Sequence, residues 1–275
     1  MRRTAYAWPP ALLAALLAAT TGRTAPLPDR LAHPLVDLQT GYLLGGSAGG
    51  RWLNAQAIAR SLKGGQSYRA YDSRRLLGAA QGSKPRSQGA PCDETLFVKM
   101  APARGEFALG GSWNALPRSP RAMSLDQPVY RGVVAAFLKQ HGLARPVVRL
   151  AQVWRVDLDG DGEPEVLVSA ANTQGRPVSP NHLSSSVSAG DYSVVLLRKA
   201  VRGQLKTIVL EAEVHPKSVE FSAPNVSRIA GVLDADGDGK MEILVRSRYY
   251  EGTSTTVYQL QGGQAPPVLS EGCGA

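Results

Sequence analysis

The strongest constraint on this chain is an acidic, glycine-containing loop that occurs twice. Residues 157–168 read DLDGDGEPEVLV, and residues 234–245 read DADGDGKMEILV. Aspartates at alternate positions can direct their carboxylates to one centre only if the backbone curls around it, and glycines at the fourth and sixth positions permit that curl. The flanking segments VWRV, EVLV and EILV are rich in β-formers. Each loop is therefore expected to join two β-strands.

Both loops offer oxygen ligands in the same order. Carboxylates occupy positions 1, 3, 5 and 9, and the main-chain carbonyl of position 7 is expected to point inward beside them. A flexible, all-oxygen set suits Ca²⁺ better than Mg²⁺ or zinc, so the sequence predicts two calcium sites. The candidate ligands are Asp157, Asp159, Asp161, Glu163 and Glu165 in the first loop, and Asp234, Asp236, Asp238, Lys240 and Glu242 in the second.

Two other interpretations of the loops are less favoured. An EF-hand would carry a bidentate Glu at position 12, where this chain has Val168 and Val245. The missing twelfth ligand also predicts a modest affinity, with a Kd of about 10⁻⁴–10⁻³ M. Alternatively, Asp-Gly sequences make hairpin turns without any ion. Three alternating aspartates, present twice, are more than a turn requires, so calcium binding is favoured.

With these residues, the loops resemble the calcium loops of the FG-GAP/VCBS repeat families, whose D-x-D-x-D-G-x-x-D/E loops join strands of β-propeller blades. Every side-chain ligand position matches in both copies, with Glu165 and Glu242 where Asp is more usual. The resemblance covers residues 147–270 at most, without the Phe-Gly and Gly-Ala-Pro signatures. It implies calcium binding and blade-like β units, although two units are fewer than a propeller contains.

The hydrophobic pattern predicts an α+β fold that is predominantly antiparallel β. Before residue 146, strands mix with a helix over 54–62 and a second helix that Asp126 opens and Gly142 ends. After residue 146, short runs rich in Val, Leu and Ile alternate with turn residues. They form two propeller-blade-like units of four strands, and the acidic loop joins the first two strands of each. The runs are 147–156, 165–171, 192–199 and 205–213, then 227–233, 242–250, 255–261 and 266–269.

The N-terminal segment predicts export. MRR is followed by the apolar run ALLAALLAA and by small residues, the order of a secretory signal peptide. The predicted organisation is a signal peptide over 1–25, a basic α+β region over 26–145 and a duplicated β region over 146–275. No later run approaches the roughly 18 apolar residues of a membrane span. We expect a protein of the periplasm, the cell envelope or the secreted fraction.

Cys92 and Cys273 are the only two cysteines. In an oxidising compartment such a pair is more often a disulfide than two free thiols, and it offers no metal-binding or CxxC spacing. A bridge would close a long loop and, in the chain-entropy description, stabilise the fold by about 4–5 kcal/mol. It would also tie the C-terminal tail to the middle of the chain.

The formal net charge of +9 is carried by the first half, because residues 147–275 are slightly acidic. The stretch 67–89 combines five basic residues with Tyr68 and Tyr71. It predicts either an anionic partner or an ordinary solvated surface. The partner would be an envelope polymer or another envelope protein, with nucleic acid less favoured.

A non-enzymatic calcium-binding protein is the favoured function, and a secreted hydrolase with structural calcium is the alternative. The hydrolase rests on Gly45-Gly46-Ser47-Ala48-Gly49, which fits the G-x-S-x-G pattern between a predicted strand and helix. The histidines form no local signature with an acid, and no HGGG-like segment occurs. A glycine-rich hairpin or loop is the preferred interpretation, and no catalytic residue is assigned. The histidines are His33, His141, His182 and His215.

Overall fold

The computed structural model describes residues 32–102, 104–173 and 186–274. The chain divides into a segment Met1–Arg30 and a compact unit Leu31–Ala275. The predicted signal peptide lies outside the described residues, as does His182. Within the described unit antiparallel strands are the predominant secondary structure, and two helices accompany them. This confirms the predicted α+β, predominantly antiparallel β class.

The N-terminal part forms an antiparallel sheet of seven strands in the order β3-β2-β1-β9-β4-β5-β8, with a separate β6–β7 pair. Helix α1 (Ala55–Ala59) follows β3 and begins where predicted, because the Asn54 side chain accepts a hydrogen bond from the Ala57 N–H. The strands are β1 (Ala32–Asp37), β2 (Leu43–Ala48), β3 (Arg51–Leu53), β4 (Gln66–Tyr71), β5 (Leu76–Gly82), β6 (Arg86–Ser87), β7 (Leu96–Phe97), β8 (Met100–Ala101) and β9 (Phe107–Leu109).

The C-terminal part forms two antiparallel meanders, as predicted. A short strand precedes the first meander, so its sheet has the order β10-β11-β12-β13-β14, while the second has β15-β16-β17-β18. In both, an acidic loop joins the first two long strands. The strands are β10 (Arg121–Ala122), β11 (Leu150–Val156), β12 (Glu165–Asn172), β13 (Asp191–Val201), β14 (Gln204–His215), β15 (Val226–Leu233), β16 (Glu242–Tyr249), β17 (Gly252–Tyr258) and β18 (Pro267–Cys273).

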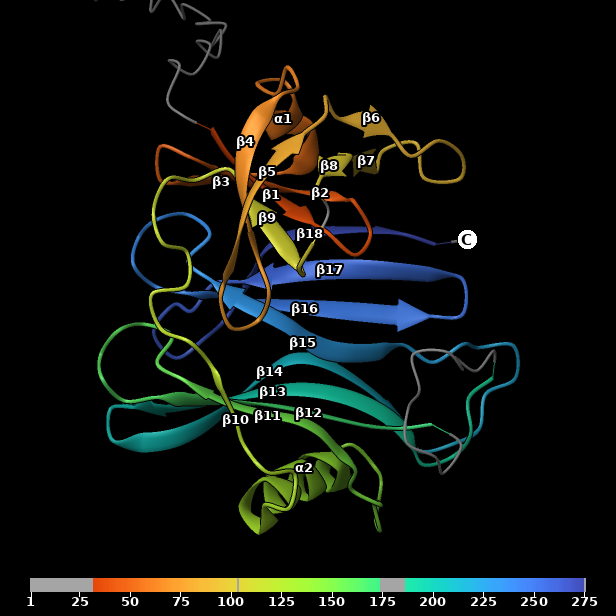
Figure 1. The fold of residues 1–275 in the computed structure, drawn as a ribbon. Helices are drawn as coiled ribbons and strands as arrows, with labels where there is room; N and C mark the ends of the chain where they lie inside the picture. The colour runs from red at the N-terminus through yellow and green to blue at the C-terminus, as the bar shows by residue number, and fades with distance from the viewer. Residues whose placement is uncertain (1–31, 103, 174–185, 275) are drawn as a thin grey trace, which may run out of the picture. The chain divides into compact units, whose positions relative to one another are not determined.

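The three large sheets are stacked, and the four-stranded sheet lies in the middle (Figure 1). One hydrophobic core joins residues of all three, from Leu35 in β1 and Leu167 in β12 to Ile243 in β16. Strand β16 is buried along Glu242–Arg246 because sheets cover it on both sides. Helix α1 packs on the outer side of the seven-stranded sheet. These contacts cross the predicted boundary at 145/146, which stays a prediction about domain organisation.

Helix α2 (Pro128–Gln140) covers the outer face of the five-stranded sheet (Figure 1). It buries Val134, Phe137 and Leu138. One detail of the prediction was wrong. Gln127, not Asp126, is the N-cap, because Pro128 already occupies the first helical turn. Val129 is 67% exposed and does not take part in the hydrophobic contact between this helix and the sheet.

A buried ion pair links the N-terminal and middle sheets. The Arg246 guanidinium on β16 donates to both carboxylate oxygens of Asp37 on β1, at 2.9 and 2.7 Å, and to Glu106 at 2.7 Å. Thr255 donates a further hydrogen bond to Asp37. Arg246 and Asp37 are 3% and 0% exposed, so each charge depends on the other.

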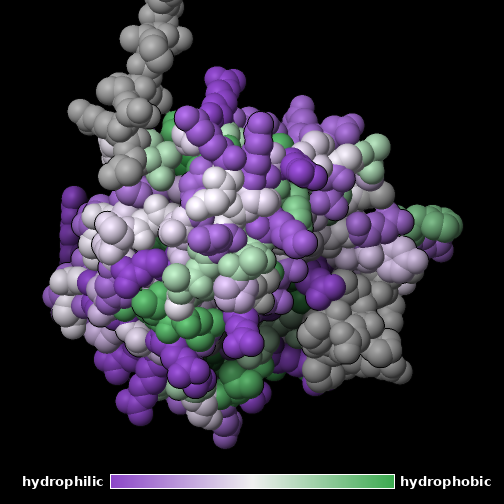
Figure 2. Space-filling model, turned by 45° about the horizontal axis from the view of Figure 1, so that its top comes forward, coloured by the Kyte–Doolittle hydropathy of each residue, from purple (hydrophilic) through white to green (hydrophobic). Residues whose placement is uncertain are grey.

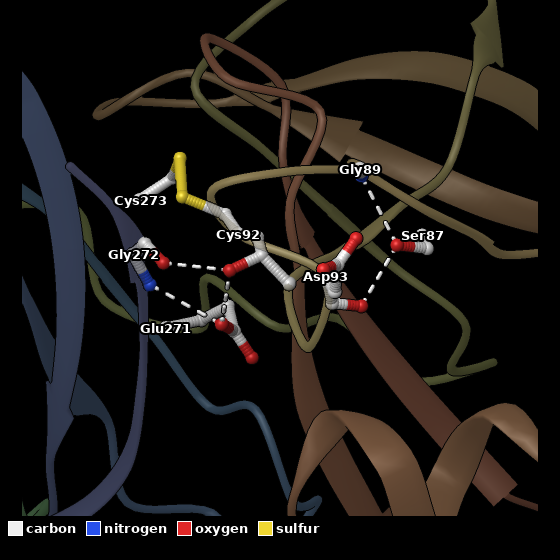
Figure 3. The surroundings of a disulfide bond; sticks show 8 residues. Ser87, Gly89, Cys92, Asp93, Glu271, Gly272 and Cys273 are labelled. Atoms are coloured by element: carbon white, nitrogen blue, oxygen red, sulfur yellow. Dashed lines mark hydrogen bonds between the residues drawn. A yellow bond between two sulfur atoms is a disulfide. The ribbon is translucent and has the colours of Figure 1, made fainter. Parts of the chain in front are cut away.

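A disulfide provides a second, covalent link, at the edge strand β18 of the middle sheet. Cys273, the last residue of β18, is bonded to Cys92 in the loop between β6 and β7, with 5.6 Å between their Cα atoms (Figure 3). The Thr95 hydroxyl lies within hydrogen-bond distance of Glu271 and of the Gly272 carbonyl, so polar contacts reinforce the same junction. The middle sheet is therefore tied to the N-terminal region at two separate points.

The face seen in Figure 2 is mainly hydrophilic, with hydrophobic side chains in small separate groups. Neither described helix combines the length and apolarity that crossing a bilayer requires.

The ion pair gives a first prediction. Replacing Arg246 with Met should lower the free energy of unfolding by about 3–5 kcal/mol, because Asp37 would be left buried without its counter-charge. Urea unfolding at neutral pH measures this. The exposed Arg248→Met is the matched control and should change stability by less than about 0.5 kcal/mol. A similar small effect for Arg246→Met would contradict the proposed role of the pair.

Removing the disulfide gives a second prediction. The double variant Cys92→Ser, Cys273→Ser should unfold with a free energy about 2–5 kcal/mol lower than the oxidised wild type, because the unfolded chain regains the entropy of a long loop. Urea unfolding of both proteins, with and without a reductant, checks it. The reductant should weaken the wild type and leave the variant unchanged.

Candidate metal site

The two acidic loops adopt nearly the same backbone conformation. Gly160 and Gly162 have φ of 77° and 87°, and Gly237 and Gly239 have 83° and 86°. This left-handed region explains why glycine stands at the fourth and sixth positions of each loop. The turns bring the N–H groups of positions 4 and 6 onto the aspartate of position 1. Asp157 accepts them at 2.7 and 3.2 Å, and Asp234 accepts them at the same distances.

A buried glutamate closes each loop at the start of the next strand. Glu165 opens β12 opposite Val156, and Glu242 opens β16 opposite Leu233. One carboxylate oxygen of each accepts a hydrogen bond from the backbone N–H of the second loop position, Leu158 or Ala235, at 2.8 Å. The two loops therefore hold their ninth-position carboxylates in the same way.

The structure brings three carboxylates of each loop together. Their possible ligand atoms all lie within 4.8 Å of one another, so either cluster could hold a metal ion. The fifth and seventh positions lie at the exposed rim, where the N–H groups of Glu163 and Lys240 donate to the carboxylates of Asp161 and Asp238. The predicted role of the position 7 carbonyls stays a prediction. The clusters are Asp157, Asp159 and Glu165, and Asp234, Asp236 and Glu242.

The first loop contains a cation of its own. The Lys199 side chain comes from β13, and its ammonium lies 2.6 Å from Glu165 Oε1 and 2.8 Å from Asp159 Oδ2. Asp161 Oδ2 lies at 3.6 Å. Lys199 is 7% exposed, so its charge is held by these carboxylates rather than by water. Nothing in the loop sequences had pointed to this residue.

The second loop has a neutral residue at the corresponding place. Val166 pairs with Arg198, and Ile243 pairs with Tyr258. Because these strands are antiparallel, the next residue pair in the register is Glu165 with Lys199 in the first loop and Glu242 with Gln259 in the second. The Gln259 amide donates to Asp236 Oδ2 at 3.1 Å, as Lys199 does to Asp159.

Glu242 consequently lacks a compensating charge. Its side chain is 0% exposed, and its Oε1 atom has no hydrogen-bond partner among the described residues. Burial is the main cause that raises the pKa of Glu242 to about 9, and the charges of Asp236, Asp238 and Asp234 add to it. The hydrogen bond from the Ala235 N–H acts in the opposite direction and lowers the pKa. Burial also raises the pKa of Glu165, but the Lys199 ammonium opposes that shift.

Lys199 stays charged despite its burial. Burial would lower its pKa, but hydrogen bonds to Asp159 and Glu165, together with their charges, outweigh burial and raise it. Burial likewise opposes ionisation of Asp159, yet Lys199 lowers the pKa of that carboxyl below its ordinary value. In the second loop, burial raises the pKa of both Asp234 and Asp236. The two loops share a ligand pattern, but the first contains a buried positive charge that favours ionised carboxylates, and the second contains none among its described residues.

The connection between β9 and β10 holds the two loops side by side. Its Arg118 guanidinium donates to the carbonyls of Asp157 and Leu158 in the first loop and of Gly239 in the second. Trp113 Nε1 donates to the Asp234 carbonyl at 2.8 Å. The loops also bond directly, from Met241 N to Leu158 O at 2.8 Å. Trp113 is thus a structural aromatic residue.

The weak enzyme motif does not form a nucleophile elbow. Ser47 lies inside β2, is 1% exposed, and its hydroxyl has no partner within the described part of the chain. The turn follows at Gly49 and Gly50, before β3, so the segment is a glycine-rich hairpin. A nucleophile elbow would instead expose its serine on a turn between a strand and a helix.

The basic stretch 67–89 spreads over β4, β5 and β6. Its two tyrosines, Tyr68 and Tyr71, are buried at 1% and 0% exposure and belong to the core. Arg69 is occupied by the carbonyls of Ser112 and Trp113. Exposed cations such as Arg74 remain on this surface. The anionic partner stays a prediction.

Comparisons with known proteins add no relative. No protein-family model, no curated protein and no solved structure matches this chain. The resemblance of its loops to FG-GAP/VCBS repeats therefore stays a prediction.

The contrast between the two glutamates can be measured in a metal-free buffer containing EDTA. Glu165→Gln should lower the free energy of unfolding by about 2–3 kcal/mol, because it removes a buried partner of Lys199. Glu242→Gln should raise it by about 1–2 kcal/mol at neutral pH, because folding of the wild type must either protonate this carboxyl or bury its charge without compensation. Urea unfolding of both variants and the wild type gives the signs. Equal losses would contradict the difference between the loops.

Proposed function

We propose that this protein is an exported, non-enzymatic calcium-binding protein of the cell envelope or the secreted fraction. Ca²⁺ would act as a structural staple between strands rather than as a reagent. The observation that carries the proposal is Glu242 Oε1, a fully buried oxygen without a described partner, beside the carboxylates of Asp234 and Asp236. A divalent cation would supply the missing charge to all three.

The donor set favours calcium over other metals. The three described members of the second cluster, Asp234, Asp236 and Glu242, all offer carboxylate oxygens, and none of them offers nitrogen or sulfur. Hard, flexible oxygen ligands suit Ca²⁺, whereas zinc favours His and Cys. The residues therefore fit the ion that the repeated sequence predicts. Asp238 is exposed at the rim, so solvent water would be available to complete the coordination.

The position of the second loop explains what a bound ion would stabilise. The loop joins β15 to β16, and β16 runs through the middle of the stacked sheets. Trp113 and Ala115 hold Asp234 through its carbonyl and N–H, so the loop also contacts the segment that leads to β10. Neutralising its carboxylates would strengthen the contact between the sheets. The proposed export rests on the sequence of residues 1–25 and agrees with the Cys92–Cys273 bond.

A secreted hydrolase is the less supported function. A serine nucleophile has to reach its substrate, and Ser47 is buried within a strand. An anionic partner for the exposed cations around Arg74 is compatible with a calcium staple, since the two lie on different parts of the chain. A fluorogenic ester panel on the wild type and Ser47→Ala tests the hydrolase, which requires serine-dependent turnover.

Calcium removal and addition test the proposed function. Adding Ca²⁺ to about ten times Kd should raise the free energy of unfolding by about 1.4 kcal/mol, with a matching rise in Tm, because the ion binds the native state. Thermal unfolding of the mature protein in EDTA and across a calcium titration measures it. Asp234→Ala should abolish most of the shift. A Tm that does not change with calcium concentration up to about 10 mM would contradict the proposal.

A further inference from the structure

The two loops differ at one residue in a way that decides whether each can accept a metal ion. A cation in the first loop would have to approach Asp159 and Glu165, which the Lys199 ammonium already contacts at 2.8 and 2.6 Å. Like charges at such separations repel strongly in a buried environment. Gln259 occupies the matching place in the second loop and carries no charge.

We propose that Lys199 is a built-in cation that replaces the metal ion in the first loop, so that the chain binds a single Ca²⁺, at the second loop. This inference rests on the proposed calcium function and deepens it, because it assigns the number of ions and the residue that sets this number. It replaces the two sites that the sequence predicts with one metal site and one internal ion-pair cluster.

The hydrogen-bond partners of the two ninth-position glutamates support the same assignment. Glu165 uses both oxygens, one for the Leu158 N–H and one for Lys199. Glu242 uses one oxygen, for the Ala235 N–H, while the other lacks a partner among the described residues. Asp159 Oδ1 in the first loop also lacks a described partner, but the Lys199 ammonium supplies the opposite charge beside it. Glu165 is thus satisfied by its own chain, whereas Glu242 has neither a second partner nor a counter-charge among the described residues.

Arg118 does not supply the second loop with a charge equivalent to that of Lys199. Its guanidinium contacts backbone carbonyls of both loops, Asp157 and Leu158 in the first and Gly239 in the second. Its positive charge is therefore shared between them. Lys240 is exposed at the rim of the second loop and has no described ion pair with its carboxylates. Lys199 is the charged group that distinguishes the two clusters.

Reciprocal exchange of the two residues tests the inference. Isothermal titration calorimetry with CaCl₂ on the mature, oxidised protein should give one site in the wild type. Lys199→Gln should give two sites, and Gln259→Lys should give none. Lys206→Gln is the matched control, because Lys206 is exposed on β14 opposite Lys199 and should leave one site. Circular dichroism verifies that each variant is folded.

The outcomes separate this inference from the proposed function. Two sites in the wild type would overturn the role of Lys199 and leave the calcium function intact. No calcium binding in the wild type would overturn both. If Lys199→Gln unfolds without calcium, Gln259→Lys still decides, because retention of one site in that folded variant would overturn the inference. One site in Lys199→Gln, folded and titrated to about 10 mM CaCl₂, would overturn it as well.

Discussion

The structure depends on how the charge of a glutamate carboxylate, buried at the start of a strand, is compensated. Both acidic loops place a glutamate, Glu165 or Glu242, at the point where the chain re-enters a sheet. An ionised carboxylate at such a place is costly unless a charge or several donors compensate it. The first loop obtains the charge from Lys199. The second offers only the neutral Gln259 and one backbone donor, and a bound cation, as proposed above, would supply the charge.

The consequences extend beyond the loops because the loops lie at a junction. The segment between β9 and β10 supplies Trp113 to the second loop and Arg118 to both. Gln259 in turn accepts a hydrogen bond from Trp52 of β3. The charge of the second loop is thus linked to the packing of the N-terminal sheet on the middle one. The same interface is held by the buried Arg246–Asp37 pair and by the disulfide.

Local sequence was sufficient for the strands of the two meanders, the loop backbone and three carboxylates of each predicted ligand set. Runs of Val, Leu and Ile between turn residues located both four-stranded meanders, and the glycine spacing specified the curl that the φ angles of Gly160 and Gly237 confirm. The stacking order of the sheets and the place of Lys199 could not be predicted in this way. Lys199 is 34 residues from Glu165 in sequence, and only the register of β12 on β13 brings them together. Such partners are invisible to spacing rules, which describe neighbours along the chain.

The two loops show how a repeated unit can keep its geometry while its electrostatics diverge. The backbone bonds to Asp157 and Asp234 are the same, so both copies keep one loop conformation. What differs is the free-energy cost of ionising the ninth-position glutamate, which an internal ammonium removes in one copy. If the proposed calcium binding holds, a lysine at this position makes the junction of β11 and β12 independent of calcium. A glutamine would then leave the junction of β15 and β16 dependent on the ion, and because β16 is buried between two sheets, that dependence would reach the centre of the fold.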